Sequence, residues 1–183
     1  MPHDIIISAA KRKILVFPDR ITFDADIKEE ASFNYGKLSF DLNRDIVPFQ
    51  HYLESYPDSR RSDEIYSYIA TAYLLSKEYK SAISALERIK HLTPEMEHNF
   101  QKALFFRGMQ LFQMGSYGDA ISEFNNSLKH SQCNLDLANL TRFYLAESYY
   151  WTDAIAESIK LNKTLYNTVR FRNSKEYPLI YFN

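Results

Sequence analysis

The sequence predicts an all-α protein, built as a solenoid of antiparallel helix pairs. The main observation is a repeat, because similar side chains recur at a spacing of 38 residues. Three such sets are Tyr73, Leu111 and Tyr149; Ala70, Gly108 and Ala146; and Ile83, Ile121 and Ile159. A period of roughly 20–50 residues is typical of a solenoid, in which each repeat buries its apolar face against its neighbours. The chain also has only four Gly and six Pro, which leaves little material for the tight turns of a sheet.

The first clear repeat contains two helices. From Asp63 to Ser76, apolar residues recur at steps of three and four, which is the periodicity of one helical stripe. A second stripe runs from Tyr79 to about His91. Because so few residues connect the two stripes, the helices are expected to lie antiparallel as a hairpin.

The next two repeats follow the same plan. Gly115 is suited to end the first helix of its repeat, because Gly adopts a left-handed backbone conformation without steric cost. In the last repeat, Thr152 or Asp153 is predicted to cap the second helix, which carries Ile155 and Ile159.

These residues resemble the tetratricopeptide repeat (TPR) family, whose helix-turn-helix repeat has about 34 residues. The matching positions are Tyr66, Ile69, Ala70, Tyr73, Tyr79, Ala82, Leu86 and Pro94, then Leu104, Gly108, Leu111, Gly115, Tyr117, Ala120 and Phe124. The resemblance implies a right-handed α-α superhelix. The longer period implies about one extra helical turn per repeat, expected around Glu95 to Phe100 and Leu135 to Asn139.

The resemblance implies that residues 1–183 form one continuous array of repeats. The expected parts are the end of a preceding repeat at 1–20, repeats at 26–58, 62–94, 98–131 and 136–172, and the start of a truncated repeat at 176–183. Neither end shows a polar capping helix, so we expect a fragment of a longer bacterial protein. The ending Tyr56-Pro57-Asp58-Ser59 resembles repeats of envelope-associated proteins, and a cytoplasmic location is the alternative.

Composition and motifs argue against several functions. Lys and Arg number 22 against 23 Asp and Glu, so no net field attracts nucleic acid, and no apolar run is long enough to insert into a membrane. No catalytic motif, cofactor loop or metal site is predicted. The nearest candidate for a metal site, His91, Glu95, Glu97 and His98, is better explained as a helix start at Thr93-Pro94 with acidic residues in its first turn. We therefore expect a protein that is not an enzyme.

The resemblance instead implies binding of a peptide or partner helix in a concave groove lined by the first helices. The expected groove residues are Phe105, Met109, Phe112, Phe143, Glu147 and Tyr150. An aromatic wall of this kind suits an apolar or amphipathic protein segment. The alternative is a structural array in which the same faces pack against other repeats, or against a second copy to form a homodimer through uncapped ends.

Overall fold

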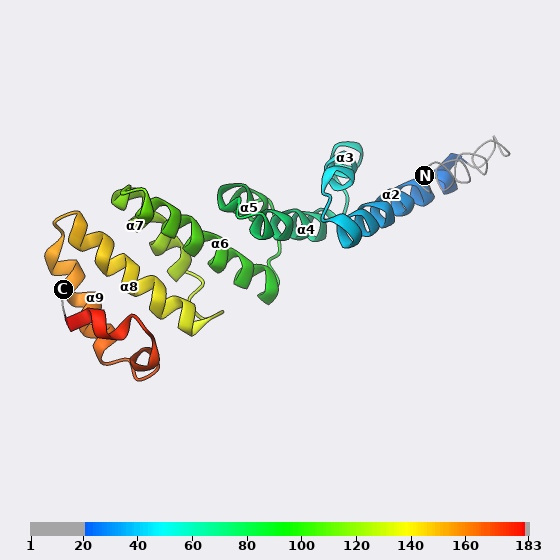
Figure 1. The fold of residues 1–183 in the computed structure, drawn as a ribbon. Helices are drawn as coiled ribbons and strands as arrows, with labels where there is room; N and C mark the ends of the chain where they lie inside the picture. Colours follow the sequence, from blue (N-terminus) through cyan, green and yellow to red (C-terminus); the bar gives the residue numbers. More distant parts are fainter. Residues whose placement is uncertain (1–20, 182–183) are drawn as a thin grey trace. The chain divides into compact units, whose positions relative to one another are not determined.

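The computed structural model describes residues 21–181, and all regular secondary structure within that range is helical. The α-helices are α2 (Ile21–Asn43), α3 (Val47–Ser55), α4 (Ser62–Leu75), α5 (Tyr79–Leu86), α6 (Pro94–Gln113), α7 (Tyr117–Leu128), α8 (Leu135–Trp151) and α9 (Ile155–Tyr166) (Figure 1). Two short 3₁₀ helices follow, η1 (Phe171–Asn173) and η2 (Tyr177–Tyr181). The all-α prediction is confirmed for this range. The repeat expected at 1–20 lies outside the described residues.

The chain forms two compact units, Met1–Arg60 and Arg61–Asn183, called unit 1 and unit 2. The division falls between the repeats predicted at 26–58 and 62–94. In unit 1, α2 and α3 pack through aromatic rings. Pro48 stands in the first turn of α3, as predicted, where its missing N–H costs no helical hydrogen bond.

A close approach of backbone and ring holds the unit 1 hairpin together. Phe49 is fully buried and lies over Gly36, where an added Cβ would come within 2.5 Å of the ring. Tyr52 is also fully buried, and its hydroxyl donates to the Glu29 carboxylate at 2.5 Å. The hairpin therefore has an aromatic core with a partly buried polar contact.

Unit 2 contains three helix pairs whose turns repeat at the spacing found in the sequence. Lys77, Gly115 and Asp153 have φ values of 62°, 77° and 62°, and they stand 38 residues apart. The residue after each of them donates its backbone N–H to the carbonyl five positions earlier, at 2.8–2.9 Å. The three acceptors are Tyr73, Leu111 and Tyr149, which form one of the repeating sets. The same C-terminal motif thus ends the first helix of every pair.

These turns explain one confirmed and one wrong prediction. Gly115 ends α6 in a left-handed conformation, as predicted. The predicted side-chain cap of α9 by Thr152 or Asp153 is wrong, because Ala154 occupies the N-cap position and provides no side-chain hydrogen bond. The Thr152 hydroxyl instead donates back to the carbonyl of Ser148 at 3.0 Å. Asp153 occupies the turn position that Gly115 fills in the preceding pair.

Helix lengths agree with the longer period. Helices α6 and α8 begin at Pro94 and Leu135 and have 20 and 17 residues, against 14 for α4. The extra turns predicted at Glu95 to Phe100 and Leu135 to Asn139 are therefore confirmed. Helix α5 ends at Leu86, earlier than predicted, and the Asp63 carboxylate of α4 accepts the N–H groups of Lys90 and His91 at 2.9 and 3.0 Å.

Packing in unit 2 proceeds from one pair to the next. Each helix from α4 to α9 contacts the one that follows, and α4, α6 and α8 also contact one another in that order. Phe124 of α7 is fully buried over Gly108 of α6, where an added Cβ would lie 2.6 Å from the ring. Two buried clusters result, one around Phe105 and Phe124 and the next around Phe143 and Leu165. Apolar side chains are thus buried layer by layer.

The last described segment departs from the expected helix start at 176–183. Residues 177–181 form 3₁₀ turns, and Phe171 of η1 is buried against Phe143. Residues 182 and 183 lie outside the described range.

Candidate functional site

Two of the six predicted groove residues lie in the core. Phe105 and Phe143 are each 3% exposed, so they offer no contact area to a ligand and their assignment to a groove surface is wrong. Phe105 packs against Phe124 and Tyr144 with ring centroids 6.0 and 6.3 Å apart. This position of the first helix faces the next helix pair, because successive pairs meet at an angle that a single helical stripe does not reveal.

The other four predicted groove residues reach the surface to different degrees. Met109 and Phe112 are half-buried and pack against the cluster around Phe124. Glu147 is half-buried on α8. Tyr150 is 44% exposed near the C-terminal end of the same helix. These side chains leave an accessible strip on α6 and α8.

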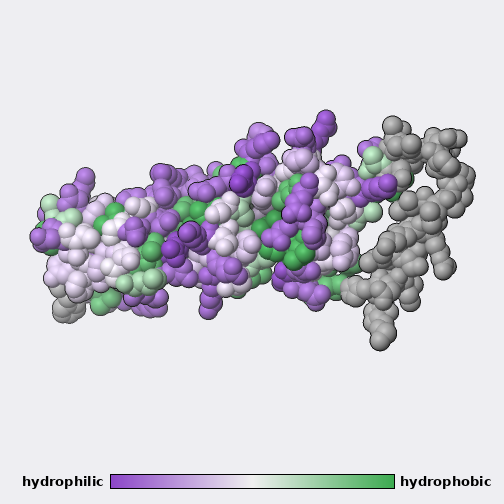
Figure 2. Space-filling model, turned by 90° about the horizontal axis from the view of Figure 1, so that it is seen from above, coloured by the Kyte–Doolittle hydropathy of each residue, from purple (hydrophilic) through white to green (hydrophobic). Residues whose placement is uncertain are grey.

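An aromatic cluster extends this strip toward the turns. It consists of Phe112, Tyr117, Tyr150 and Trp151, and we call it the turn-side aromatic cluster. Trp151 stacks on Tyr117 at 5.7 Å with an interplanar angle of 12°, while Phe112 meets Tyr117 edge-on at 5.3 Å. Trp151 is nevertheless 58% exposed. Figure 2 shows that apolar residues reach the surface as separate patches among hydrophilic ones.

Sequence reasoning missed Trp151, although a signal was present. It is the only Trp in the chain, and it is the last residue of α8. A Trp beside a turn, where the core has ended, is favoured at contact surfaces because its ring supplies a large area with few rotatable bonds. Its stacking partner Tyr117 comes from a different helix pair, so their contact could not be read from local periodicity.

The residues considered for a metal site in the sequence lie in α6 and just before it. Thr93 caps α6, its hydroxyl accepting the N–H of Met96 at 3.3 Å, so the helix start predicted there is confirmed. Among residues 21–181, no three His, Cys, Asp or Glu side chains come together as a metal site. None of the helices in that range is both long and apolar enough to span a membrane.

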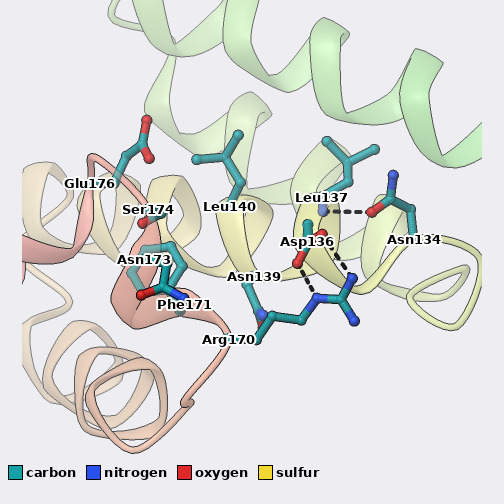
Figure 3. Close-up of a pocket in the computed structure, with 10 residues that line it drawn as sticks. All are labelled: Asn134, Asp136, Leu137, Asn139, Leu140, Arg170, Phe171, Asn173, Ser174 and Glu176. Atoms are coloured by element: carbon teal, nitrogen blue, oxygen red, sulfur yellow. Dashed lines mark hydrogen bonds and ion pairs between the residues drawn. The ribbon is translucent and has the colours of Figure 1, made fainter.

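A cavity of about 560 Å³ lies between the first half of α8 and the segment containing η1 and η2 (Figure 3). Its lining combines amides, hydroxyl, charged groups and apolar side chains: Asn134, Asp136, Leu137, Asn139, Leu140, Arg170, Phe171, Asn173, Ser174 and Glu176. The two stretches are at least 30 residues apart in sequence. The cavity therefore exists only in the folded protein.

An ion pair stands at one side of the cavity. The Arg170 guanidinium donates from Nε to one Asp136 carboxylate oxygen and from Nη2 to the other at 2.9 Å (Figure 3). Hydrogen bonding from Arg170 holds the pKa of Asp136 below its ordinary value, and the same pair raises the pKa of Arg170. Both groups are exposed, so the contribution to stability is screened by solvent.

Replacing Asp136 with Asn is expected to lower stability near neutral pH and to change little in acid. Because the folded pKa of Asp136 is lowered, its stabilisation is complete above the unfolded pKa of about 4 and is lost as pH falls through the folded value. Urea unfolding of wild type and variant at several pH values measures the difference in their free energies of unfolding. The exposed Glu157→Gln exchange on α9 is the control. If the difference in unfolding free energy between Asp136→Asn and wild type stayed the same in strong acid, the stabilising role of the ionised Asp136 carboxylate would be contradicted.

At the other side of the cavity stands a buried acid. Glu176 is 7% exposed, and its carboxylate pairs with Lys175 Nζ at 3.9 Å, an ammonium on a side chain that is 92% exposed. Ser174 Oγ nearby is buried and makes no hydrogen bond within residues 21–181. Neither residue was identified from the sequence.

A comparison of the sequence with protein-family models finds no match, and a comparison with curated protein sequences finds none either.

Proposed function

We propose that this chain is a TPR-like α-α superhelix that acts as a non-catalytic scaffold for protein–protein interaction. Support for the repeat architecture comes from the left-handed turn residues Lys77, Gly115 and Asp153 at a constant spacing of 38. The pairing of a small residue with a ring, Gly108 under Phe124, also fits the alternation of small and large residues in that family. Stacked hairpins of this kind offer a rigid surface with little ordering cost on binding.

The observation that carries the binding proposal is the turn-side aromatic cluster. Tyr150 and Trp151 expose large rings whose positions are already fixed by ring contacts, at 5.8 Å to one another and at 5.7 Å between Trp151 and Tyr117. Pre-positioned aromatic residues commonly contribute most of the binding energy at protein interfaces. The half-buried Glu147 precedes Tyr150 by about one helical turn on α8, so rings and a carboxylate lie together and suit an amphipathic peptide or helix. The surface differs from the one expected from sequence by excluding Phe105 and Phe143.

A test uses Trp151 as its own reporter. Peptides selected from a random phage-displayed library against the full chain are expected to change the fluorescence of Trp151, the only Trp present. Replacing Tyr150 with Ala should weaken their binding by about tenfold or more, because truncating a central aromatic residue removes most of its contact area. Fluorescence titration gives both the emission change and the dissociation constant.

The matched control is Tyr35→Ala. Tyr35 is 49% exposed, close to the value for Tyr150, but it lies on α2 of unit 1. Its exchange should leave peptide affinity unchanged. Peptides that bind without altering Trp151 emission, or that lose affinity equally in both variants, would remove the turn-side aromatic cluster from the binding site.

The alternative proposal is a self-associating array, and one observation favours it. Ile155 and Ile159 on α9 are 40% and 44% exposed. One repeat earlier, Tyr117 stacks on Trp151 of α8, and Ile121 is half-buried against the cluster around Phe124. An apolar face that is covered in one repeat is thus open in the next. Sedimentation velocity over a range of concentrations separates the two proposals, because a chain that stays monomeric counts against self-association.

A further inference from the structure

The cavity between α8 and the η1–η2 segment contains an acid whose counter-charge is not buried with it. Removing a carboxylate from water is costly unless a cation or hydrogen-bond donors replace the lost solvation. Glu176 is only 7% exposed, while the ammonium of Lys175 extends into solvent. A cation inside the cavity would therefore give the Glu176 carboxylate a more buried counter-ion than the exposed ammonium of Lys175.

The other cation of the cavity is already engaged. Arg170 directs its guanidinium to Asp136 through two hydrogen bonds, away from Glu176 (Figure 3). The cavity lining thus contains two carboxylates and one guanidinium, and the cation paired with the second carboxylate, Lys175, lies outside the lining. Because Arg170 and Asp136 neutralise one another, Arg170 does not serve as the counter-ion of Glu176.

The remaining walls define what else a ligand would meet. Ser174 Oγ is buried without a hydrogen-bond partner in the described part of the chain, so it can accept from a ligand donor. Leu140 and Phe171 supply apolar surface beside these polar groups. The combination is a carboxylate, a hydroxyl and an apolar wall, which complements a cationic head on a short hydrocarbon stem.

The neighbouring tyrosine reports the same local charge. Burial raises the pKa of the Tyr144 phenol, and the charges of Glu176 and Glu147 raise it further. The Tyr144 ring thus lies within the field of both carboxylates. Negative potential beside an aromatic ring is an environment that favours ammonium groups.

We propose that this cavity binds a primary alkylammonium group, with Glu176 as its counter-ion and Ser174 as a hydrogen-bond acceptor. The ammonium has three donors, and its alkyl stem would pack on Leu140 and Phe171. The chemistry is shared by free alkylamines and by lysine side chains of a protein. This site is separate from the turn-side aromatic cluster, so it goes beyond the proposed scaffold function and does not depend on it.

The test compares n-butylammonium with 1-butanol, a neutral molecule of similar shape, by NMR titration of the ¹⁵N-labelled full chain. Saturable shifts in residues 134–140 and 170–177 with the amine, and at least about tenfold weaker binding of the alcohol, are expected because a charge-assisted contact is lost. Equal binding of both, or no saturation by the amine, would overturn the proposal. This comparison needs no variant, so it does not depend on the folding of one.

Variants then assign the charge to a residue. Glu176→Gln keeps the shape of the side chain and should abolish the preference for the amine, whereas Glu157→Gln on the exposed part of α9 should preserve it. A preference for the amine that is retained in Glu176→Gln would reject Glu176 as the counter-ion.

A third probe, Nα-acetyl-lysine methylamide, distinguishes the two sources of the ammonium group. Tighter binding than that of n-butylammonium supports a lysine side chain of a protein, and weaker binding supports a free amine. Trp151 emission is followed in parallel, so failure here is distinguishable from failure of the scaffold proposal.

Discussion

Phe124→Ala is expected to lower the free energy of unfolding of unit 2 by about 3–5 kcal/mol, the usual cost of truncating a fully buried Phe. Phe124 of α7 has no exposed surface and contacts Phe105 and Tyr144, which belong to α6 and α8. Its ring thus joins two successive helix pairs, and its loss would leave a cavity between them. Urea unfolding followed by Trp151 fluorescence measures the effect, because the single Trp lies in unit 2.

The control for this prediction is Phe106→Ala. Phe106 stands on α6, is 36% exposed and stacks on Tyr79 at 5.3 Å. Because part of its ring is already in contact with water, its truncation should cost clearly less than that of Phe124. Equal losses in the two variants would show that Phe124 does not join the layers as described.

Gly108→Ala is expected to destabilise unit 2 by about 1–3 kcal/mol, the typical cost of overpacking a core. Alanine is the better helix former by roughly 1 kcal/mol, so a gain would be expected if packing allowed it. Here the added Cβ would lie 2.6 Å from Phe124 Cε1, and that ring is buried on every side. Thermal and urea unfolding of the full chain measure the sign of the change.

Gly118→Ala provides the matched comparison. Gly118 lies in the first turn of α7, and an added Cβ there meets no atom within 4 Å. This exchange should be neutral or stabilise by up to about 1 kcal/mol through helix propensity alone. If Gly108→Ala stabilised as much as Gly118→Ala, α6 and α7 would not approach one another as closely as the structure shows. The double variant Gly108→Ala/Phe124→Leu should recover part of the loss, because the two residues are in contact.

Much of the helix pattern could be predicted from periodicity. The start of α4 near Asp63 and of α5 at Tyr79, and the end of α6 before Gly115, depend on local hydrogen bonds and on apolar residues at helical spacing. The end of α5 could not be predicted in this way. The carboxylate that accepts the N–H groups of Lys90 and His91 belongs to Asp63, on a different helix.

The exposure of the expected groove residues was predicted less well, for a related reason. Phe105 and Phe143 stand 38 residues apart and occupy equivalent positions, so one error in their orientation was repeated in both. Whether a side chain on the first helix faces solvent or the next pair depends on how pairs rotate against one another. A stripe of apolar residues does not specify the angle between successive helix pairs. Tyr150, which follows on the same stripe about two helical turns after Phe143, is exposed because α8 ends beside it.

The helical class, the spacing of the turns and the alternation of small and large residues could be predicted without coordinates, because each depends on contacts between residues close in the chain. Which apolar side chains reach water is set by packing between helix pairs, and the same packing assembles the cavity of Asp136, Arg170, Ser174 and Glu176. These properties depend on segments more than thirty residues apart that meet through packing. The physical reason is that periodicity specifies the face of a helix, whereas burial is specified by the neighbour which that face meets.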